Sequence, residues 1–263
     1  MRPLITLTTD FGASSPYVAQ MKGVILSLAR EVDLIDITHG IGPQRIQEGA
    51  IVLSDTTPRF PPGTIHLAVV DPGVGTSRQL IYAEIGPQRY VAPDNGLLSI
   101  LIRQKSPARI IAVEDPAYWL PQPSQTFHGR DILAPVAAHL ALGLDPALLG
   151  PALVGCVMLD SAAPQRLPSG VRGEVQLVDS FGNLITNIRR EDLLWLGDMA
   201  RLVVRCGGRE ISGLVDTYAA ATPGELVTLI DSQGRLEIAV CQGSAARELS
   251  IGSGTEVVVI GSL

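Results

Sequence analysis

The stretch Thr64-Ile65-His66-Leu67-Ala68-Val69-Val70-Asp71-Pro72-Gly73-Val74-Gly75 decides the fold class. Its first seven residues form a short, nearly continuous apolar run, which is typical of a strand buried on both faces of a parallel sheet. The Asp-Pro-Gly that follows is a turn sequence and ends the strand. Ligands of open parallel sheets bind beyond the carboxyl ends of the strands, so Asp71 stands where such a protein carries out its chemistry.

Short aliphatic strands alternate with helix-length segments on both sides of this stretch. We predict further strands at residues 4–8, 34–38, 79–85 and 109–113, and helices at 17–29, 46–53, 96–104 and 131–142. Such alternation predicts an α/β layer with a mostly parallel sheet, which we assign to a catalytic domain over residues 1–160.

The pattern changes after residues 159–170, a segment with two prolines and two serines that is predicted to be a linker. Beyond it, short strands flank tight turns such as Ser180-Phe181-Gly182-Asn183 and Ser232-Gln233-Gly234. The predicted strands are 173–179, 184–188, 201–205, 210–215, 226–231, 235–240 and 256–260. Residues 171–263 are therefore expected to form a small antiparallel β-barrel or sandwich, with a role in substrate binding.

The composition excludes several classes of protein. With 263 residues, 46% hydrophobic and 17% charged, the chain can bury one or two cores and is not disordered. No window approaches the roughly 18 apolar residues of a membrane helix. The first residues lead directly into a strand pattern, so we expect no signal peptide and a cytoplasmic protein.

Charge and cysteine content narrow the choice further. The net charge is −6 and no basic face is visible, so nucleic acid and anionic membranes are poor partners. Cys156, Cys206 and Cys241 are far apart and form no C-x-x-C pair, which argues against a disulfide framework and against a structural zinc site.

Acidic residues gather at the predicted strand ends. Asp10, Asp71 and Asp94 each have a glycine two residues further along the chain, and glycine permits close backbone approach to a ligand. Asp is also a common turn and cap residue, so each one alone has a purely structural explanation. The segment from Asp71 to Arg78 contains G-x-G but neither the dinucleotide fingerprint nor the phosphate-loop sequence.

Among the four histidines, His128 stands out. It lies in Thr126-Phe127-His128-Gly129-Arg130-Asp131, a polar loop before a predicted helix, where catalytic groups concentrate. His39, His66 and His139 are interpreted as structural. The residues alone thus indicate an α/β enzyme with an acidic pocket.

Seven short motifs in a fixed order give a more specific indication. They are Thr9-Asp10-Phe11-Gly12, Tyr17-Val18 with Met21-Lys22-Gly23, Asp36-Ile37-Thr38-His39, Val70-Asp71-Pro72-Gly73-Val74-Gly75, Ala92-Pro93-Asp94-Asn95-Gly96, Thr126-Phe127-His128-Gly129-Arg130-Asp131, and Asp179-Ser180-Phe181-Gly182-Asn183 with Thr186-Asn187-Ile188. In this order they resemble the S-adenosylmethionine (SAM) hydroxide adenosyltransferases, or SAM hydrolases, which are relatives of the 5′-fluorinases and chlorinases.

The resemblance implies a fold, an assembly and a reaction. It implies an N-terminal α/β domain, a C-terminal β-barrel and a homotrimer with active sites between subunits. The implied reaction is attack of water or hydroxide on C5′ of SAM, releasing adenosine and methionine, with SAM as substrate and with neither a cofactor nor a metal. The sulfonium is already a good leaving group, so an in-line water held by preorganised polar groups suffices.

The resemblance also assigns residues. The family's catalytic Asp, Arg and His correspond to Asp71, Arg78 and His128, which would orient the water. The ribose diol would bind Asp10, with Asp71 nearby, because a carboxylate accepts two charge-assisted hydrogen bonds. The remaining substrate contacts are expected from Phe181 and Asn183 at the adenine, from Ser232 and Tyr218 on the methionine side, and from Asp179.

Two positions depart from the family pattern, and three alternative functions remain. Ser15 and Cys241 stand where the family often has an acid and an asparagine, and both are expected near the methionine. A halogenase would carry an aromatic residue and a serine in place of Asp71 and Gly129, and the carboxylate present here would repel a halide. A metal-dependent nucleotidase would use Asp10, Asp71, Asp94 and His128. A non-catalytic SAM or adenosine sensor would bind without turnover.

Overall fold

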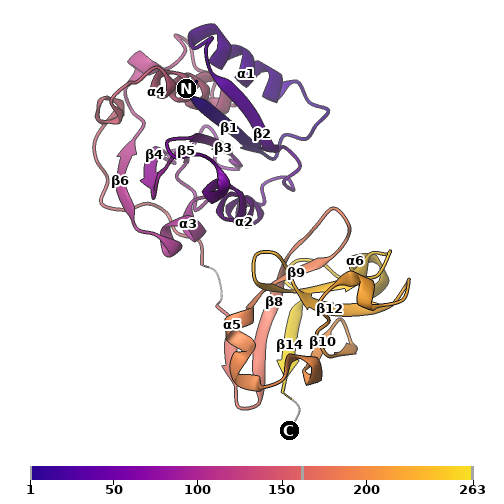
Figure 1. Cartoon of the computed structure of the whole chain (residues 1–263). Helices are drawn as coiled ribbons and strands as arrows, with labels where there is room; N and C mark the ends of the chain where they lie inside the picture. Colours follow the sequence, from indigo (N-terminus) through magenta and orange to yellow (C-terminus); the bar gives the residue numbers. More distant parts are fainter. Residues whose placement is uncertain (1, 161–162, 262–263) are drawn as a thin grey trace. The chain divides into compact units, whose positions relative to one another are not determined.

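The computed structural model describes residues 2–160 and 163–261. The chain forms two compact units, Met1–Leu159 and Asp160–Leu263, each with hydrophobic clusters of its own. Figure 1 shows the elements of each unit in chain order. None of the helices in the described residues is long and apolar enough to cross a membrane.

The N-terminal unit is built on a six-stranded sheet with the order β2-β1-β3-β5-β4-β6. All neighbours are parallel except β4, which runs antiparallel to both β5 and β6. The predicted mostly parallel sheet is therefore confirmed. The strands are β1 (Leu4–Thr9), β2 (Asp33–Thr38), β3 (Ile65–Val69), β4 (Leu80–Ile85), β5 (Gln88–Pro93) and β6 (Pro107–Ala112).

Strand β5 was not among the predicted strands. It pairs with β4 in a hairpin whose connection is Gly86-Pro87, with Gly86 at φ 60°. A Gly-Pro dipeptide is a turn signal, and it was available in the sequence. The hairpin reverses β4, which is why this strand alone runs against the others.

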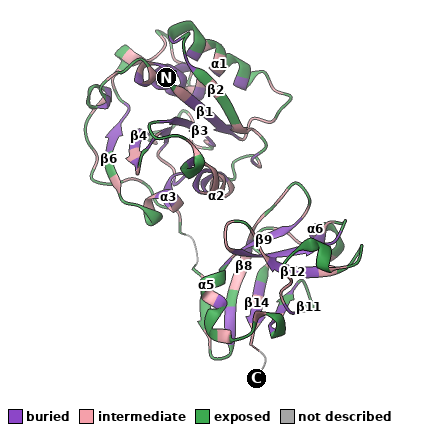
Figure 2. Ribbon diagram, in the orientation of Figure 1, coloured by how far each residue is buried: buried purple, intermediate pink, exposed green. Residues whose placement is uncertain are grey.

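The two faces of the sheet carry separate layers of helices. Because side chains alternate along a strand, β3 sends Ile65, Leu67 and Val69 into one cluster and Ala68 into the other. The first cluster includes α1 (Tyr17–Leu28) and α4 (Ala134–Ala141), and the second includes α2 (Ile46–Thr56) and α3 (Ser99–Gln104). Figure 2 shows the buried centre of the sheet and the largely exposed edge strand β2. A π-helical turn, η3 (Gly129–Leu133), opens the helix predicted at 131–142.

The C-terminal unit is a nearly closed antiparallel barrel, as predicted. Its strands follow the order β11-β10-β14-β8-β9-β13-β12, and β7 pairs with β8. The two ends of this path meet where the Val215 amide donates to the Thr228 carbonyl at 2.8 Å and the Thr228 hydroxyl donates to the Gly213 carbonyl at 2.8 Å. The strands are β7 (Gln165–Leu167), β8 (Gly170–Val178), β9 (Leu184–Arg189), β10 (Val203–Cys206), β11 (Arg209–Ser212), β12 (Leu226–Ile230), β13 (Arg235–Val240) and β14 (Glu256–Ile260), and the two short α-helices are α5 (Arg190–Leu193) and α6 (Ala245–Leu249).

The predicted linker over residues 159–170 is wrong in its second part. Residues 165–167 form β7, which pairs with β8 through a tight turn at Pro168-Ser169. The proline that suggested a linker instead closes this hairpin. Residues 161 and 162 lie outside the described residues.

Candidate active site

The centre of the candidate site forms where the chain leaves β3. Asp71 follows that strand directly, and Arg78 lies at the other end of the connection to β4. The Arg78 guanidinium donates from Nε to both Asp71 carboxylate oxygens at 3.0 Å and from Nη2 to Oδ2 at 2.6 Å. The same Nη2 lies 2.8 Å from His128 Nδ1. The structure thus brings together the three residues predicted to be catalytic.

A glycine allows the two loops of this centre to pack closely. Gly75 has φ +78°, and a Cβ at this position would lie only 2.5 Å from the backbone carbonyl oxygen of Gln125. Gln125 belongs to the loop that carries His128. The second glycine of the G-x-G therefore serves loop packing, because a side chain at Gly75 would push the loop of Asp71 away from the loop of His128.

Hydrogen-bond accounting fixes the tautomer of His128. A guanidinium can only donate, so His128 Nδ1 accepts from Arg78 and the proton of the neutral ring resides on Nε2. Burial and the charge of Arg78 lower the pKa of His128 below its ordinary value, while Asp71 and Asp131 oppose that shift. The imidazole is therefore neutral at pH 7 and offers an Nε2–H donor.

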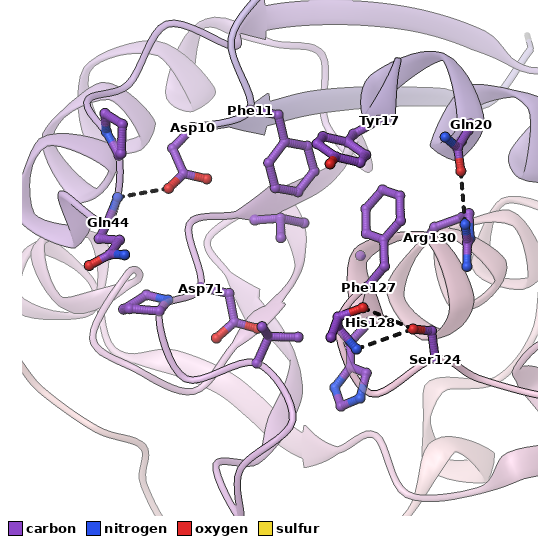
Figure 3. Close-up of a pocket in the computed structure, with 16 residues that line it drawn as sticks. Asp10, Phe11, Tyr17, Gln20, Gln44, Asp71, Ser124, Phe127, His128 and Arg130 are labelled. Carbon is purple, nitrogen blue, oxygen red and sulfur yellow. Dashed lines mark hydrogen bonds between the residues drawn. The ribbon is translucent and has the colours of Figure 1, made fainter. Parts of the chain in front are cut away.

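A cavity of about 680 Å³ lies beside this centre in the N-terminal unit. Figure 3 shows Asp10 and Asp71 on one side of it and Phe127 and His128 on the other. The Gln44 amide donates to Asp10 Oδ2 at 2.8 Å, which leaves Asp10 Oδ1 free of any partner within the described residues. Asp10 thus lines the cavity with one carboxylate oxygen that accepts no hydrogen bond from the described residues.

Three aromatic rings that were not assigned a role line the same cavity. Phe11, Tyr17 and Phe127 contact one another edge to face, with ring centroids 5.3–5.7 Å apart. Phe11 and Phe127 stand within motifs that the sequence singled out, but their spacing along the chain gave no sign that the rings would meet.

A second cavity, of about 650 Å³, lies within the C-terminal unit. Four of the predicted substrate residues line it: Asp179, Phe181, Asn183 and Tyr218. Phe181 is 76% exposed. Asp179 instead organises its own turn, since it accepts from the amides of Phe181 and Asn183 and from the Asn183 side chain at 2.8–3.0 Å.

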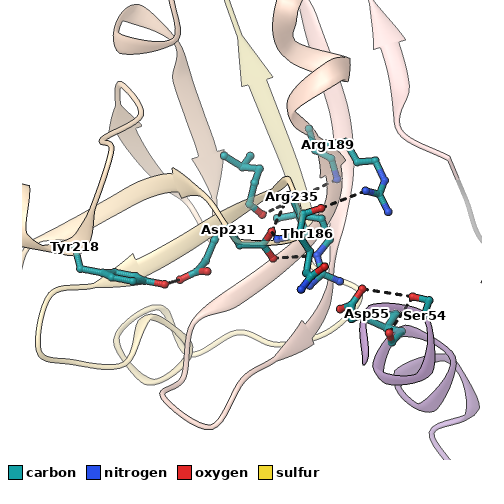
Figure 4. Close-up of polar contacts among 12 residues, drawn as sticks. Ser54, Asp55, Thr186, Arg189, Tyr218, Asp231 and Arg235 are labelled. Carbon is teal, nitrogen blue, oxygen red and sulfur yellow. Dashed lines mark hydrogen bonds and ion pairs between the residues drawn. The ribbon is translucent and has the colours of Figure 1, made fainter. Parts of the chain in front are cut away.

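Ser232 does not line either of these cavities within the chain. It is exposed at the turn between β12 and β13, which Asp231 holds by accepting from the amides of Gln233 and Arg235 at 2.8 Å. Figure 4 shows Asp231 beside Arg235. The Arg235 Nε lies 3.0 Å from Asp231 Oδ2.

Glu237 is a residue of the second cavity region that the sequence did not reveal. Its buried carboxylate accepts a hydrogen bond from the Tyr218 hydroxyl at 2.6 Å, so it anchors the cavity-lining ring to β13. Burial raises the pKa of the Glu237 carboxyl, and the nearby carboxylates Asp179 and Asp231 add to the effect.

Asp94 does not join the other two strand-end acids. It is not among the residues lining the first cavity, and its Oδ1 accepts the Val157 amide at 2.8 Å. Its role is structural, because it holds the end of the N-terminal unit. No group of three or more His, Cys, Asp or Glu side chains suited to a metal ion occurs in the described part of the chain.

The other histidines have structural partners, as interpreted. The Thr6 hydroxyl lies 2.7 Å from the ring of the fully buried His66, and the Thr9 hydroxyl lies 2.9 Å from that of His39. His139 packs edge to face on Tyr118 at 5.4 Å.

The two departures from the family pattern fall in different units. The Ser15 hydroxyl donates to the Phe11 carbonyl at 2.6 Å and so closes the loop before α1. Cys241 lines the second cavity and lies 3.4 Å from the Ala221 carbonyl through its Sγ.

Comparison with known proteins gives matches along nearly the whole chain. The models of the N-terminal and C-terminal domains of SAM hydroxide adenosyltransferase match residues 5–150 and 173–258. An (R)-S-adenosyl-L-methionine hydrolase of Thermus thermophilus is 39% identical, over 98% of this chain and 99% of the relative. A fluorinase of Nocardia brasiliensis is 29% identical, over 98% and 97%. A crystal structure of an uncharacterized conserved protein from Thermotoga maritima superposes with a TM-score of 0.92 at 39% identity, over 97% and 99%.

Proposed function

This chain belongs to the SAM hydroxide adenosyltransferase family, and we propose that it hydrolyses S-adenosyl-L-methionine to adenosine and L-methionine. The observation that carries the proposal is the hydrogen-bonded network of Asp71, Arg78 and His128 at the wall of the first cavity. The relatives named as hydrolases, similar over the whole chain, support the same reaction.

The proposed reaction uses only water, the substrate and polar side chains of the protein. A water oxygen forms a bond to C5′ while the C5′–S bond breaks, and the electron pair of the C5′–S bond passes to sulfur. The sulfonium becomes the neutral thioether of methionine, and one proton of the water is released. The protein must hold that water in line, about 3 Å from C5′, and stabilise its hydroxide character.

The donor and acceptor pattern of the network suits this task. His128 Nε2–H can donate to the lone pair of the water and so fix the direction in which the oxygen faces C5′. Asp71 can accept a water proton, and its charge favours the developing proton transfer. Arg78 holds both groups, so His128 acts in this scheme as an orienting group and not as the base.

The substrate contacts follow the two cavities. We assign the ribose diol to Asp10, and the adenine to Asp179, Phe181 and Asn183 in the C-terminal unit, with Tyr218 and Ser232 on the methionine side. In the proposed homotrimer, the C-terminal unit of one subunit completes the site of its neighbour. Closed three-fold symmetry permits such head-to-tail contacts without leaving an open end.

The alternative functions meet specific obstacles. A halogenase would have to bind its halide beside the Asp71 carboxylate, at a position where Gly129 supplies no hydroxyl. The nucleotidase alternative required Asp94 at the site, but Asp94 accepts a hydrogen bond from the Val157 backbone amide and does not line the cavity. The sensor alternative shares the pocket and differs only in turnover.

The decisive experiment is incubation with SAM, with and without EDTA, followed by chromatography for adenosine. We expect adenosine and methionine in equal amounts under both conditions. Asp71→Asn should lower kcat by about 100-fold or more, a typical loss for a proton-transfer or orienting group. Asp94→Asn is the matched control, since it also follows a strand and precedes glycine but lies outside the cavity, and it should keep its activity.

Two results would contradict the proposal. SAM that binds but stays intact would identify a sensor. Activity that disappears in EDTA and returns with a divalent cation would identify a metal-dependent enzyme.

A further inference from the structure

Three of the eleven aromatic residues of this chain lie at one wall of the first cavity. Aromatic side chains make up only 4% of the sequence. Three of them, Phe11, Tyr17 and Phe127, nevertheless form a closed triangle of edge-to-face contacts with interplanar angles of 70–78°. We call these three residues the aromatic wall.

The wall comes from three separate elements. Phe11 follows β1, Tyr17 begins α1 and Phe127 lies in the loop before η3. Phe11 and Phe127 also pack against the core, whereas Tyr17 as a residue is 48% exposed. An exposed aromatic ring at a cavity wall, held in place by two partly buried rings, is a surface prepared for a ligand.

The wall already holds one cation. The Arg130 guanidinium carbon lies 4.9 Å from the centroid of the Phe127 ring, within the range of a cation–π contact. Arg130 is neutralised by Asp131, whose carboxylate oxygens lie 2.5 and 2.9 Å from its guanidinium nitrogens. The negative faces of Phe11 and Tyr17 have no such partner in the described chain.

The charges around the cavity leave a place for one more cation. Asp71 is paired with Arg78, and Arg130 is paired with Asp131. Asp10 receives a backbone amide, and among the described residues no basic side chain pairs with it. The cavity therefore combines one uncompensated carboxylate with aromatic faces, which together favour a positively charged ligand.

We propose that the aromatic wall binds the sulfonium centre of the substrate through cation–π attraction, with Tyr17 as the ring that faces it. This inference rests on the proposed function, because SAM supplies the sulfonium. It adds a specificity element, since the wall would select the charged sulfonium over the neutral thioether that the reaction leaves behind.

The kinetic consequence follows from the change in charge. The sulfur loses its positive charge as the C5′–S bond breaks, so the attraction is strongest in the bound substrate and weaker in the transition state. An interaction of this kind lowers KM without raising kcat. Removing it should raise KM and leave kcat unchanged or higher, whereas the loss of a ring that only positioned the substrate would lower kcat.

The test compares two ligands that cannot be hydrolysed at C5′. Sinefungin carries an ammonium group in place of the sulfonium, and S-adenosylhomocysteine carries a neutral thioether. Their dissociation constants are measured by calorimetry for the wild type, Tyr17→Leu and Tyr17→Phe. The wild type should prefer sinefungin, Tyr17→Leu should reduce that preference about three- to tenfold, and Tyr17→Phe should retain it.

The outcomes separate this inference from the proposed function. If the wild type forms adenosine from SAM but Tyr17→Leu leaves the ligand preference and KM unchanged, the cation–π site is wrong and the hydrolase stands. A lower kcat for Tyr17→Leu with an unchanged preference would assign the ring to positioning alone, and overturn the inference. A wild type that neither forms adenosine nor binds either ligand overturns the proposed function, and this inference with it.

Discussion

At the scale of single residues, Arg78 orients the two other polar groups of the site. It occupies the Nδ1 lone pair of His128 and both oxygens of Asp71, so one guanidinium orients two other groups of the site. The side chains of Arg78 and Asp71 are only 11% and 5% exposed, and this shielding from water strengthens the Coulomb attraction between them relative to a surface pair.

The pH dependence of activity should reveal this arrangement. Protonating His128 breaks its bond from Arg78 and brings two positive charges together. Because burial and Arg78 lower the pKa of His128, kcat/KM should stay constant down to about pH 6.5, the ordinary histidine pKa, and fall only below it.

Two variants test the cause of that shift. Arg78→Met should raise the pKa of His128, and Asp71→Asn should lower it, as followed by NMR titration of the ring protons. An acid limb above pH 6.5 in the wild type, together with an unmoved His128 pKa in both variants, would contradict the network.

A pair of glycine variants should separate backbone strain from loop packing. Gly63 and Gly75 both have φ near +80°, but a Cβ on Gly63 meets no atom within 4 Å, whereas one on Gly75 meets the Gln125 carbonyl. Both Gly→Ala variants should lose about 1 kcal/mol of stability from the left-handed backbone. Gly75→Ala should in addition reduce kcat by tenfold or more, because the loops of Asp71 and His128 move apart.

The measurement is urea unfolding combined with steady-state kinetics on both variants. Equal kcat values would show that the contact with Gln125 does not position the site.

The sequence could identify the polar centre but not the aromatic wall. Asp71 and His128 lie in loops whose residue types indicate chemistry on their own, and Arg78 was assigned by the resemblance to the family. The meeting of Phe11, Tyr17 and Phe127 depends on how β1, α1 and the loop before η3 converge, and no local pattern encodes that convergence. Glu237 was missed for a similar reason, since its partner Tyr218 lies on a separate turn.

At the scale of elements, β3 contributes apolar side chains to the core and also contains a buried histidine. His66 lies between Phe60 and Tyr90, with ring centroids 5.5 and 5.0 Å away, and is fully buried. Burial lowers the pKa of His66 to about 4. The run around it was correctly read as a buried strand because its apolar residues suit both faces of the sheet.

This histidine should make stability depend on pH. Its folded pKa lies below the unfolded value, so its contribution is complete above pH 6.5 and is lost as the pH falls toward 4. The expected loss by pH 5 is about 2 kcal/mol from this residue.

Urea unfolding of the wild type and His66→Phe at pH 7.5 and 5 provides the measurement. The variant cannot be protonated at this position, so the decrease should be about 2 kcal/mol smaller than in the wild type. Equal decreases in both proteins would show that His66 titrates normally.

The two strands that the sequence failed to predict lie beside turns. Strand β5 follows the Gly-Pro turn, and strand β7 precedes the Pro-Ser turn. Their pairing with β4 and β8 outweighs the breaker residues beside them, and pairing partners are not visible in a single short segment.

At the scale of the whole molecule, we expect a homotrimer of about three times 27.8 kDa with active sites shared between subunits. Asp71→Ala and Asn183→Ala should each be inactive alone. When the two are mixed, dissociated and reassembled, part of the activity should return, because one interface of a mixed trimer can pair two intact halves.

Light scattering and the activity of the mixture provide the measurement, with each variant reassembled alone as the control. A fully active monomer, or no recovery on mixing, would contradict the shared site.

The separate cores of the two units have a spectroscopic consequence. The chain has two tryptophans, and each unit contains one. Trp119 packs on the core of the N-terminal unit, while Trp195 lies in the C-terminal unit with the Arg166 guanidinium carbon 3.9 Å from its ring centroid. Replacing either tryptophan by phenylalanine leaves a fluorophore that reports on one half alone, so the order in which the two halves melt can be read directly from their emission.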